Sequence, residues 1–440
     1  MMAPVSSPPT STLAAPTSVM AAPATTGSTT TSSMTVSATS LMPQAKTGVG
    51  LFQVFDAMGT PRISAAGAEA DAKRYGIVWG ARPGMASAWR AGNSKIIASY
   101  YFPQETDLSY ISWGGAGHDL AWWQANHPDW VLYSCTASGT PTRIPAFVGG
   151  LMTNIPLDFH NPAVVDYQVR AAAAYAKANG YNALAADEVV FYNIGGATAG
   201  AGAYACGVYQ NGTFVRRYSS KSDPQWTTDT VAWARTAHSI AQSEGLKLIV
   251  NHPAGDPNNP NEQEMLSNVD ADVDETGYSD YGLYKSSSTL FKLTLDWVRF
   301  AQSHGTAPLV IDKYVQSGEL SGTEIEHSIA TYLMGNEGGE GLFAGNRNGY
   351  GVEQYHSEYA VNYGTACGDY YGGSSASPNI WYRRFSNAIV VVNSGSSRAS
   401  EAATLPAGHA YRDLEGRPVS NPLNVANFDA YVLLTTNGCH

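Results

Sequence analysis

Short runs of apolar, β-prone residues alternate with longer segments in which apolar residues recur every three or four positions, from residue 70 onward. Strands that alternate with helices are typical of a parallel sheet, and eight of them predict a (β/α)8 TIM barrel. The eight runs that we interpret as strands are 75–79, 95–102, 130–134, 183–192, 246–251, 269–275, 308–314 and 340–346.

The segments between these runs carry the signals of helix ends. Asn161 is a predicted N-cap, and Pro162 stands at the first helical position, where its missing N–H costs nothing. Thr323 is a second predicted N-cap, with Glu326 in the capping-box position three residues later. The predicted helices are 162–179, 228–244, 287–304 and 323–333.

Both ends of the chain differ from this central pattern. Residues 1–47 are almost entirely Ser, Thr, Ala, Pro and Met, which predicts a disordered low-complexity tail. This tail has neither the basic start nor the unbroken apolar core of a signal peptide. In residues 373–440, short β-prone runs separated by Gly, Ser, Pro and Asn predict a small antiparallel β-sandwich-like domain. The barrel is therefore assigned to residues 48–372.

The composition narrows the possible ligands. Charged residues make up only 14% of the chain, against about 25% in typical domains, while there are 10 Trp and 26 Tyr. The net charge of −11 argues against nucleic acid and anionic membranes as partners. Hydroxyls, amides and aromatic rings suit a neutral polyhydroxylated ligand, which predicts a polysaccharide or oligosaccharide as partner. The composition leaves the oligomeric state open.

The segment 180–193 holds the strongest candidate for chemistry. Gly180 suits a helix stop because it adopts positive φ freely, and residues 183–186 are small and apolar, as in a strand buried on both faces. Asp187 follows where that strand should end, at the barrel rim where active sites lie. Burying a carboxylate there is costly, so we interpret Asp187 as catalytic rather than as a helix cap or an ion-pair partner.

A second carboxyl group is expected on the sixth predicted strand. Cleavage of a glycosidic bond needs two carboxyl groups, one to protonate the leaving oxygen and one to attack or to activate water. Glu275 ends the run 269–275 and is the preferred partner of Asp187, although a shift of one residue would select Asp274 instead. Glu188 is expected to point away from the cavity if Asp187 points into it, and it is therefore only a second choice as a catalytic residue.

Several segments together resemble a known group of enzymes. They are K-I-I-A-S-Y-Y at 95–101, L-D-F-H-N-P at 157–162, G-Y-N-A-L-A-A-D-E at 180–188 and W-Y-R-R-F-S-N-A-I-V-V-V-N at 381–393. In this order they resemble the endo-α-1,4-polygalactosaminidase-like enzymes and related TIM-barrel glycoside hydrolases. The resemblance covers roughly residues 70–435.

The resemblance implies a glycoside hydrolase that needs no cofactor. It implies Asp187 on strand four as nucleophile or base, and Glu275 on strand six as acid/base. The chain departs from the family at Asn182-Ala183, where the family has Asp-Gly, and at Glu188, where it has Asn. The Ala-Asp-Glu at 186–188, where the family has Leu-Asp-Asn, favours an alternative, a non-catalytic carbohydrate-binding or cell-surface protein on a degenerate hydrolase barrel.

Further polar residues follow the predicted strands and could bind sugar hydroxyls. Asp158 has an equally favoured alternative role, in which its side chain hydrogen-bonds to the backbone of its own loop and stabilises that loop. Gln104 and Glu105 also follow a predicted strand. The predicted substrate-binding residues are Tyr101, Asp158, Asn251, His252, Asp312, Lys313 and Asn346.

Other chemistries find little support. The Asp-x-Asp-x-Asp run at 270–274 is followed by Glu275 where a calcium loop needs Gly, and neither H-E-x-x-H nor G-x-S-x-G occurs, so no metal site is predicted. Export to the cell envelope or medium is expected, and there the four cysteines could pair in three ways, although four free thiols remain an alternative. The cysteines are Cys135, Cys206, Cys367 and Cys439.

Overall fold

The computed structural model describes residues 48–56, 62–108, 117–279, 288–314, 320–337, 339–346, 350, 355–395 and 400–439. The predicted low-complexity tail, residues 1–47, lies outside the described residues. No helix within the described ranges is long and apolar enough to cross a membrane.

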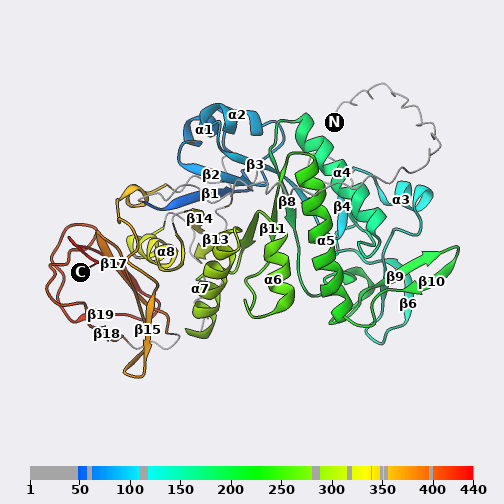
Figure 1. Ribbon diagram of the computed structural model, residues 1–440. Coiled ribbons are helices and arrows are strands. Elements are labelled where there is room, and N and C mark those ends of the chain that lie inside the picture. The colour runs from blue at the N-terminus through cyan, green and yellow to red at the C-terminus, as the bar shows by residue number, and fades with distance from the viewer. Residues whose placement is uncertain are drawn as a thin grey trace, which may run out of the picture. The chain divides into compact units, whose positions relative to one another are not determined.

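Eight parallel strands close into a barrel, which confirms the predicted (β/α)8 fold (Figure 1). Each strand pairs with the barrel strands that precede and follow it in the chain, and the last pairs with the first. The strands are β1 (Gly50–Val54), β2 (Tyr75–Trp79), β3 (Ile97–Pro103), β8 (Ala183–Asp187), β11 (Lys247–Asn251), β12 (Ala271–Asp274), β13 (Ala307–Tyr314) and β14 (Glu340–Asn346).

One predicted barrel strand is wrong and one was missed. The run 130–134 overlaps β5 (Tyr133–Cys135), which pairs antiparallel with β9 (Tyr204–Gln210) outside the barrel. The first barrel strand is instead β1. Both segments are short and apolar, and composition does not specify which sheet a strand joins. Because the two errors cancel, Asp187 still ends the fourth barrel strand.

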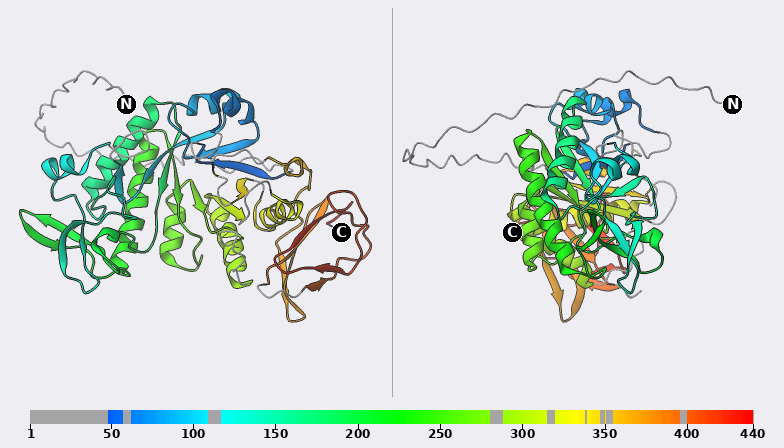
Figure 2. Two further views of the ribbon diagram at one scale, coloured as in Figure 1. Left: turned by 180° about the vertical axis from the view of Figure 1, so that it is seen from behind. Right: turned by 90° about the vertical axis from the view of Figure 1, so that its right-hand side faces the viewer.

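The predicted helix ends are correct in one case and shifted in another. Asn161 caps α4, accepting a hydrogen bond from Ala163 N–H. The N-cap of α8 lies two residues earlier than predicted, because Ser321 and not Thr323 forms the capping box, with Glu324. The helices are α1 (Ala65–Asp71), α2 (Ala86–Gly92), α3 (Leu120–Asn126), α4 (Pro162–Ala178), α5 (Pro224–Ser243), α6 (Pro260–Ser267), α7 (Ser288–Ser303) and α8 (Gly322–Gly335). Helices α4 and α5, in green, lie side by side in both views of Figure 2.

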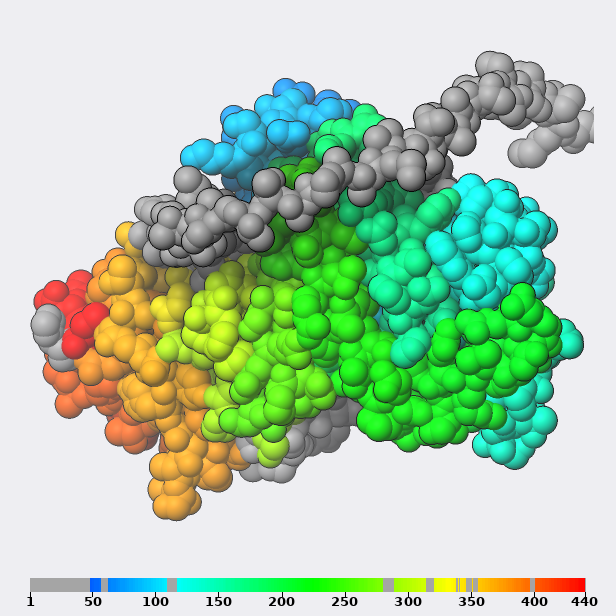
Figure 3. All heavy atoms as spheres, turned by 45° about the vertical axis from the view of Figure 1, so that its right-hand side comes forward, coloured from blue at the N-terminus to red at the C-terminus, as the bar shows by residue number. Residues whose placement is uncertain are grey.

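Two insertions combine into a second sheet, which we call the insertion sheet. Strands β5 and β6 (Pro141–Pro145) come after barrel strand β3, and β9 and β10 (Thr213–Arg216) come after β8. They pair in the order β10-β9-β5-β6, and the Cys135–Cys206 disulfide joins the two insertions. Figure 3 shows the cyan atoms of the first insertion against the green atoms of the second. A shorter pair, β4 (Thr106–Leu108) and β7 (Asn154–Pro156), also belongs to the first insertion.

The C-terminal residues form an antiparallel sheet in the order β15-β16-β17-β20. These strands are Tyr371–Ser374, Ser377–Arg384, Ala388–Asn393 and Ala430–Leu434, and the separate pair β18–β19 is Glu401–Ala403 with Leu423–Val425. One face of this sheet packs against α8, and the Cys367–Cys439 disulfide ties its ends (Figure 1). Tertiary contacts therefore select one of the three possible cysteine pairings.

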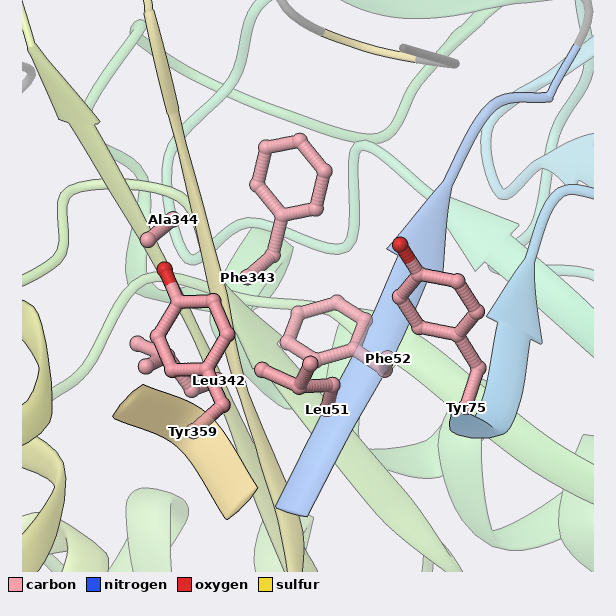
Figure 4. Close-up of a pocket in the computed structure, with 7 residues that line it drawn as sticks. All are labelled: Leu51, Phe52, Tyr75, Leu342, Phe343, Ala344 and Tyr359. Atoms are coloured by element: carbon pink, nitrogen blue, oxygen red, sulfur yellow. The ribbon is translucent and has the colours of Figure 1, made fainter. Parts of the chain in front are cut away.

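Side chains fill the barrel interior in alternation along each strand. Phe52, Trp79 and Phe343 belong to the interior cluster, whereas Leu51 and Leu342 pack outward toward the helices. Strands β1 and β14 pair only at their beginnings. A small apolar pocket lies beside these two strands, and Figure 4 shows Tyr359 against Leu342 in it. The residues that line the pocket are Leu51, Phe52, Tyr75, Leu342, Phe343, Ala344 and Tyr359.

Candidate active site

Alternation along the barrel strands decides which rim residues face the interior. On β8, Ala183 and Ala185 belong to the interior cluster, while Leu184 and Ala186 face the helices. Asp187 continues the interior series at the carboxyl end of the strand. The same rule places Glu275 inward, since Ala271 and Val273 of β12 are interior residues.

Both oxygens of the Asp187 carboxyl group accept hydrogen bonds. The Tyr101 O–H from β3 donates to Oδ2 at 2.8 Å, and the backbone N–H of Glu188 donates to Oδ1 at 2.9 Å. Strand β3 lies beside β8, with Tyr101 opposite Ala185, so the sheet register itself fixes the phenol against the carboxyl group. Burial and the Asp187 charge keep the pKa of Tyr101 well above 10, so the phenol remains a donor.

The pKa of Asp187 lies far above its ordinary value. Burial raises it, followed by the negative charges of Glu275 and Glu188, and together they bring the pKa to about 7. The hydrogen bonds from Tyr101 and Glu188 act in the opposite direction but do not outweigh them. Because a charge on Glu275 perturbs Asp187, β8 and β12 bring these two carboxyl groups together at one end of the barrel.

Glu275 lies beside a cation. Nζ of Lys313, from β13, is 3.5 Å from Oε2 of Glu275 and lies 4.2 Å from the centre of the Tyr350 ring. Lys313 belongs to the interior series of β13, which includes Leu309 and Ile311. The site therefore has one ammonium group next to one of its carboxyl groups.

The alternative partner, Asp274, has a different environment. It is fully buried on the outward series of β12, and its carboxyl group accepts hydrogen bonds from backbone N–H groups. The donors are Thr276 at 3.1 Å, Gly277 at 3.2 Å and Ala254 at 3.3 Å. These contacts shape the turn after β12 and leave Glu275 as the inward carboxyl group.

Three of the predicted substrate-binding residues share the interior series with the two acids. Tyr101 and Lys313 contact Asp187 and Glu275 as described, and Asn251 continues the interior series of β11 after Ile249. Asn251 is 9% exposed, and its backbone oxygen accepts a hydrogen bond from Val189 N–H. Its role as a substrate contact stays a prediction.

His252 and Asp312 face outward and bond to the protein. His252 has both ring nitrogens engaged, with Val189 O at 2.7 Å and with Oε2 of Glu262, from α6, at 2.9 Å. Burial lowers the pKa of His252, but the hydrogen bond and charge of Glu262 outweigh it and raise the pKa to about 9. Asp312 accepts the backbone N–H of Ser279 at 2.8 Å. These contacts are structural ones between neighbouring elements.

The other two predicted binding residues are Asp158 and Asn346. Asp158 is fully buried in the loop before α4, and its Oδ2 accepts a hydrogen bond from Nε of Arg217 at 2.9 Å. Ionisable neighbours of Asp158 include His160, just before α4, and Asp229 of α5. Asn346 ends β14 opposite Tyr314, and its side chain lies outside the described residues.

Sequence reasoning gave two acids too little weight. Glu188 was only a second choice for the chemistry, yet its charge acts on Asp187 and its side chain contacts Glu105. Glu105 follows β3 and is only 1% exposed. The available signal was an acidic residue directly after a buried strand, which Glu105 shares with Asp187. Tyr350, the ring partner of Lys313, carried no such signal.

The described residues hold no group of three or more His, Cys, Asp or Glu side chains arranged to bind a metal ion. The candidate site consists of carboxyl groups, a phenol, an amide and an ammonium group. Carboxyl groups in such a site can transfer protons and can act as nucleophiles.

The fold and the site define the class: a (β/α)8 barrel with paired carboxyl groups at the carboxyl end of its strands. No protein-family model matches the chain, and no curated protein matches it significantly. Among solved structures it is similar to the GH27 β-L-arabinopyranosidase of Geobacillus stearothermophilus, with 9% identity, a TM-score of 0.49, and 89% of this chain and 96% of that chain covered.

Two other solved structures show the same level of likeness. An α-amylase from Malbranchea cinnamomea has 10% identity and a TM-score of 0.47, covering 88% of this chain and 96% of that one. Aspergillus fumigatus Ega3, solved with galactosamine, has 11% identity and a TM-score of 0.39, covering 70% and 95%. Likeness at this level carries no argument about activity, and the class of fold rests on the strand order of the barrel itself.

Proposed function

We propose that the protein is a glycoside hydrolase that cleaves a polysaccharide with Asp187 and Glu275. The observation that carries the proposal is that two carboxyl groups occupy inward positions at the barrel rim, at the end of β8 and just after β12, and that the charge of Glu275 helps to raise the pKa of Asp187. Two carboxyl groups at one site are what cleavage of a glycosidic bond requires. Membership of the endo-α-1,4-polygalactosaminidase-like group is part of the proposal and rests on the sequence resemblance.

In this proposal Asp187 is the nucleophile or general base. The donors on both of its oxygens, Tyr101 O–H and Glu188 N–H, stabilise the ionised form that attack or proton abstraction needs. Glu275 then protonates the leaving oxygen. With a pKa of about 7 for Asp187 in the free enzyme, kcat/KM should rise with pH through about 7.

A reversed division of the two roles is favoured by Lys313. Its ammonium group beside Glu275 stabilises the ionised form of that carboxyl group, which suits a nucleophile or base better than an acid. Asp187, protonated below about pH 7, would then be the acid, and kcat/KM would fall with pH through the same range. The direction of this limb of the pH profile separates the two assignments.

The charges of the site bear on the substrate. Among the residues that the structure describes, four carboxyl groups lie at or beside it, those of Glu105, Asp187, Glu188 and Glu275, and the Lys313 ammonium group contacts one of them. This excess of acidic groups disfavours a polymer of uronic acids and favours neutral or cationic sugars. The two disulfides suit an oxidising compartment and support the expected location in the cell envelope or outside the cell.

The test is the release of reducing ends from a panel of neutral, de-N-acetylated amino and uronic-acid polysaccharides. Asp187→Asn and Glu275→Gln should each abolish release that the wild type shows. The matched controls are Asp166→Asn and Glu264→Gln, which make the same changes at exposed ion pairs. Proton NMR of the first product anomer decides between retention and inversion.

Affinity electrophoresis on the same polymers separates the alternative function. Binding by the wild type and both site variants, with no release from any polymer, would support the non-catalytic carbohydrate-binding protein. Release that persists in Asp187→Asn would contradict the assignment of the site.

A further inference from the structure

A buried carboxyl group, that of Glu105, and a partly buried one, that of Glu188, lie side by side next to Asp187, and the proposed reaction does not use either of them. Glu105 is 1% exposed, and among the described residues its carboxyl oxygens have no hydrogen-bond partner from another residue except the Glu188 carboxyl group. One oxygen of Glu188, Oε2, likewise has no described partner outside this pair. The residue before Glu105 is anchored to the site, because Gln104 N–H donates to the backbone oxygen of Asp187 at 3.0 Å.

A contact between two carboxyl groups is stable only when one of them carries a proton. Burial and then the charge of Glu188 raise the pKa of Glu105 well above its ordinary value. Burial also raises the pKa of Glu188, and the hydrogen bond with Glu105 lowers it. Glu105 is therefore the protonated member, and its O–H donates to the Glu188 carboxylate.

The backbone of Glu188 explains why such a contact matters at this position. Its φ is +58°, in the left-handed region, where a side chain with a Cβ is strained. In this conformation its N–H donates to Asp187 Oδ1, and the next N–H, of Val189, donates to the backbone oxygen of Asn251. A strained backbone conformation persists only where surrounding contacts stabilise it. The Glu105 carboxyl group makes such a contact with the Glu188 side chain.

We propose that Glu105 and Glu188 are positioning residues for Asp187: a proton on Glu105 ties down the Glu188 side chain and keeps the Glu188 N–H on the Asp187 carboxyl group. This inference rests on the proposed glycosidase function and deepens it. The ionisable groups that face the pair are Asp187, Tyr101 and, through Asp187, Glu275.

The conservative and the truncating variants of Glu105 separate positioning from simple packing. In Glu105→Gln the amide N–H still donates to Glu188, so kcat should stay within about threefold of the wild type. Glu105→Ala removes the donor, and kcat should fall roughly 10- to 100-fold with KM little changed, since misplacement of a reacting group acts on the chemical step. Equal kcat in Glu105→Ala and the wild type would overturn the proposal.

Glu188→Gln tests the charge of the pair. The amide keeps a hydrogen bond with Glu105, while one of the negative charges that raise the pKa of Asp187 disappears. The Asp187 limb of the kcat/KM profile should therefore move to lower pH, with the limiting kcat preserved to within a few fold. An unmoved limb in Glu188→Gln would contradict the placement of its charge beside Asp187.

Thermal unfolding between pH 4 and pH 9 tests the proton without using activity. A carboxyl group whose folded pKa is raised loses stability as pH rises from its unfolded pKa, near 4.5, through the folded value. Glu105→Gln cannot titrate there, so its Tm relative to the wild type should increase with pH, while the exposed control Glu264→Gln should show no such trend. If the Tm of Glu105→Gln and that of the wild type change with pH in parallel, the proposal that Glu105 carries the proton is wrong.

The two failures are distinguishable. A wild type that cleaves no polymer removes the proposed function and the positioning role with it, even if the unfolding curves diverge. A wild type that cleaves, with Glu105→Ala equally active, removes the positioning role alone.

Discussion

The charged groups of the barrel rim and those of the interface between α8 and the C-terminal sheet have opposite surroundings: like charges at the rim, and hydrogen-bond acceptors and an opposite charge at the interface. Arg383, on β16, is 1% exposed, and Leu333 O at 2.9 Å, Asn336 O at 3.0 Å and Gly368 O at 3.1 Å accept its hydrogen bonds, with Glu337 as its ionic partner. At the rim, Asp187 is partly buried and lies beside two acids that, together with burial, raise its pKa to about 7.

The difference teaches how to tell a structural charge from a functional one. At α8, Arg383 satisfies carbonyl groups at the end of the helix, and each of its nitrogens has a partner, so the charge joins two elements. At the rim, burial and neighbouring acids disfavour the ionised forms of Asp187 and Glu105, a cost that is typical of functional sites. The predictions below test this contrast, from the largest expected effect to the smallest.

Asp187→Asn should lower kcat by roughly 10²- to 10⁴-fold and at the same time raise stability above neutral pH. The wild type loses stability as pH rises from 3.8, the unfolded value, to about 7, the folded value, because ionisation is disfavoured in the fold. The variant lacks this loss, so its Tm advantage should grow across that range. Lower stability of Asp187→Asn at pH 8 would place Asp187 with the structural charges.

Arg383→Ala should lower the free energy of unfolding by about 3 kcal/mol, because carbonyl groups of α8 and the Glu337 carboxyl group lose their donors. Urea unfolding measures the loss, and Arg417→Ala, at an exposed ion pair, is the control with little effect. Activity per folded molecule should stay unchanged. A loss of kcat in Arg383→Ala without a loss of stability would contradict the structural role assigned to Arg383.

Glu326→Gln should remove a pH-dependent loss of stability at the same interface. Glu326 of α8 accepts Val432 N–H at 2.9 Å, and burial raises its pKa to about 7, with Asp429 acting in the same direction. The wild type therefore loses stability as pH rises from about 4.5 to 7, an effect of about 2 kcal/mol. Unfolding of the two proteins should agree at pH 4 and favour Glu326→Gln at pH 8.

Ser321→Ala should cost about 1 kcal/mol, because it removes the N-cap of α8, whereas Thr323→Ala should cost much less. Thermal unfolding of the two variants compares the observed cap with the one that the sequence predicts. Equal losses would show that the start of α8 is set by its packing on the C-terminal sheet and not by the capping box.

The central barrel and half of its site could be predicted because they follow from local patterns. The alternation of apolar runs and helices identified seven of the eight barrel strands, and Asp187 followed from a small-residue strand that ends in an acid. Strand β1 was missed because a five-residue apolar run carries no mark of the sheet it joins. The cap of α8 was shifted because Ser321 and Thr323 both begin an S/T-x-x-E pattern.

The sequence by itself determined the alternation that closes the barrel and puts Asp187 and Glu275 on inward positions, because the period of two along a strand is a local property. Tertiary structure alone decided the cysteine pairing, the contact of Lys313 with Glu275, and the left-handed turn that aims Glu188 at Glu105. These features depend on distances between segments that are far apart in the chain. Local residue preferences act only between neighbours in the sequence, so they cannot specify such distances.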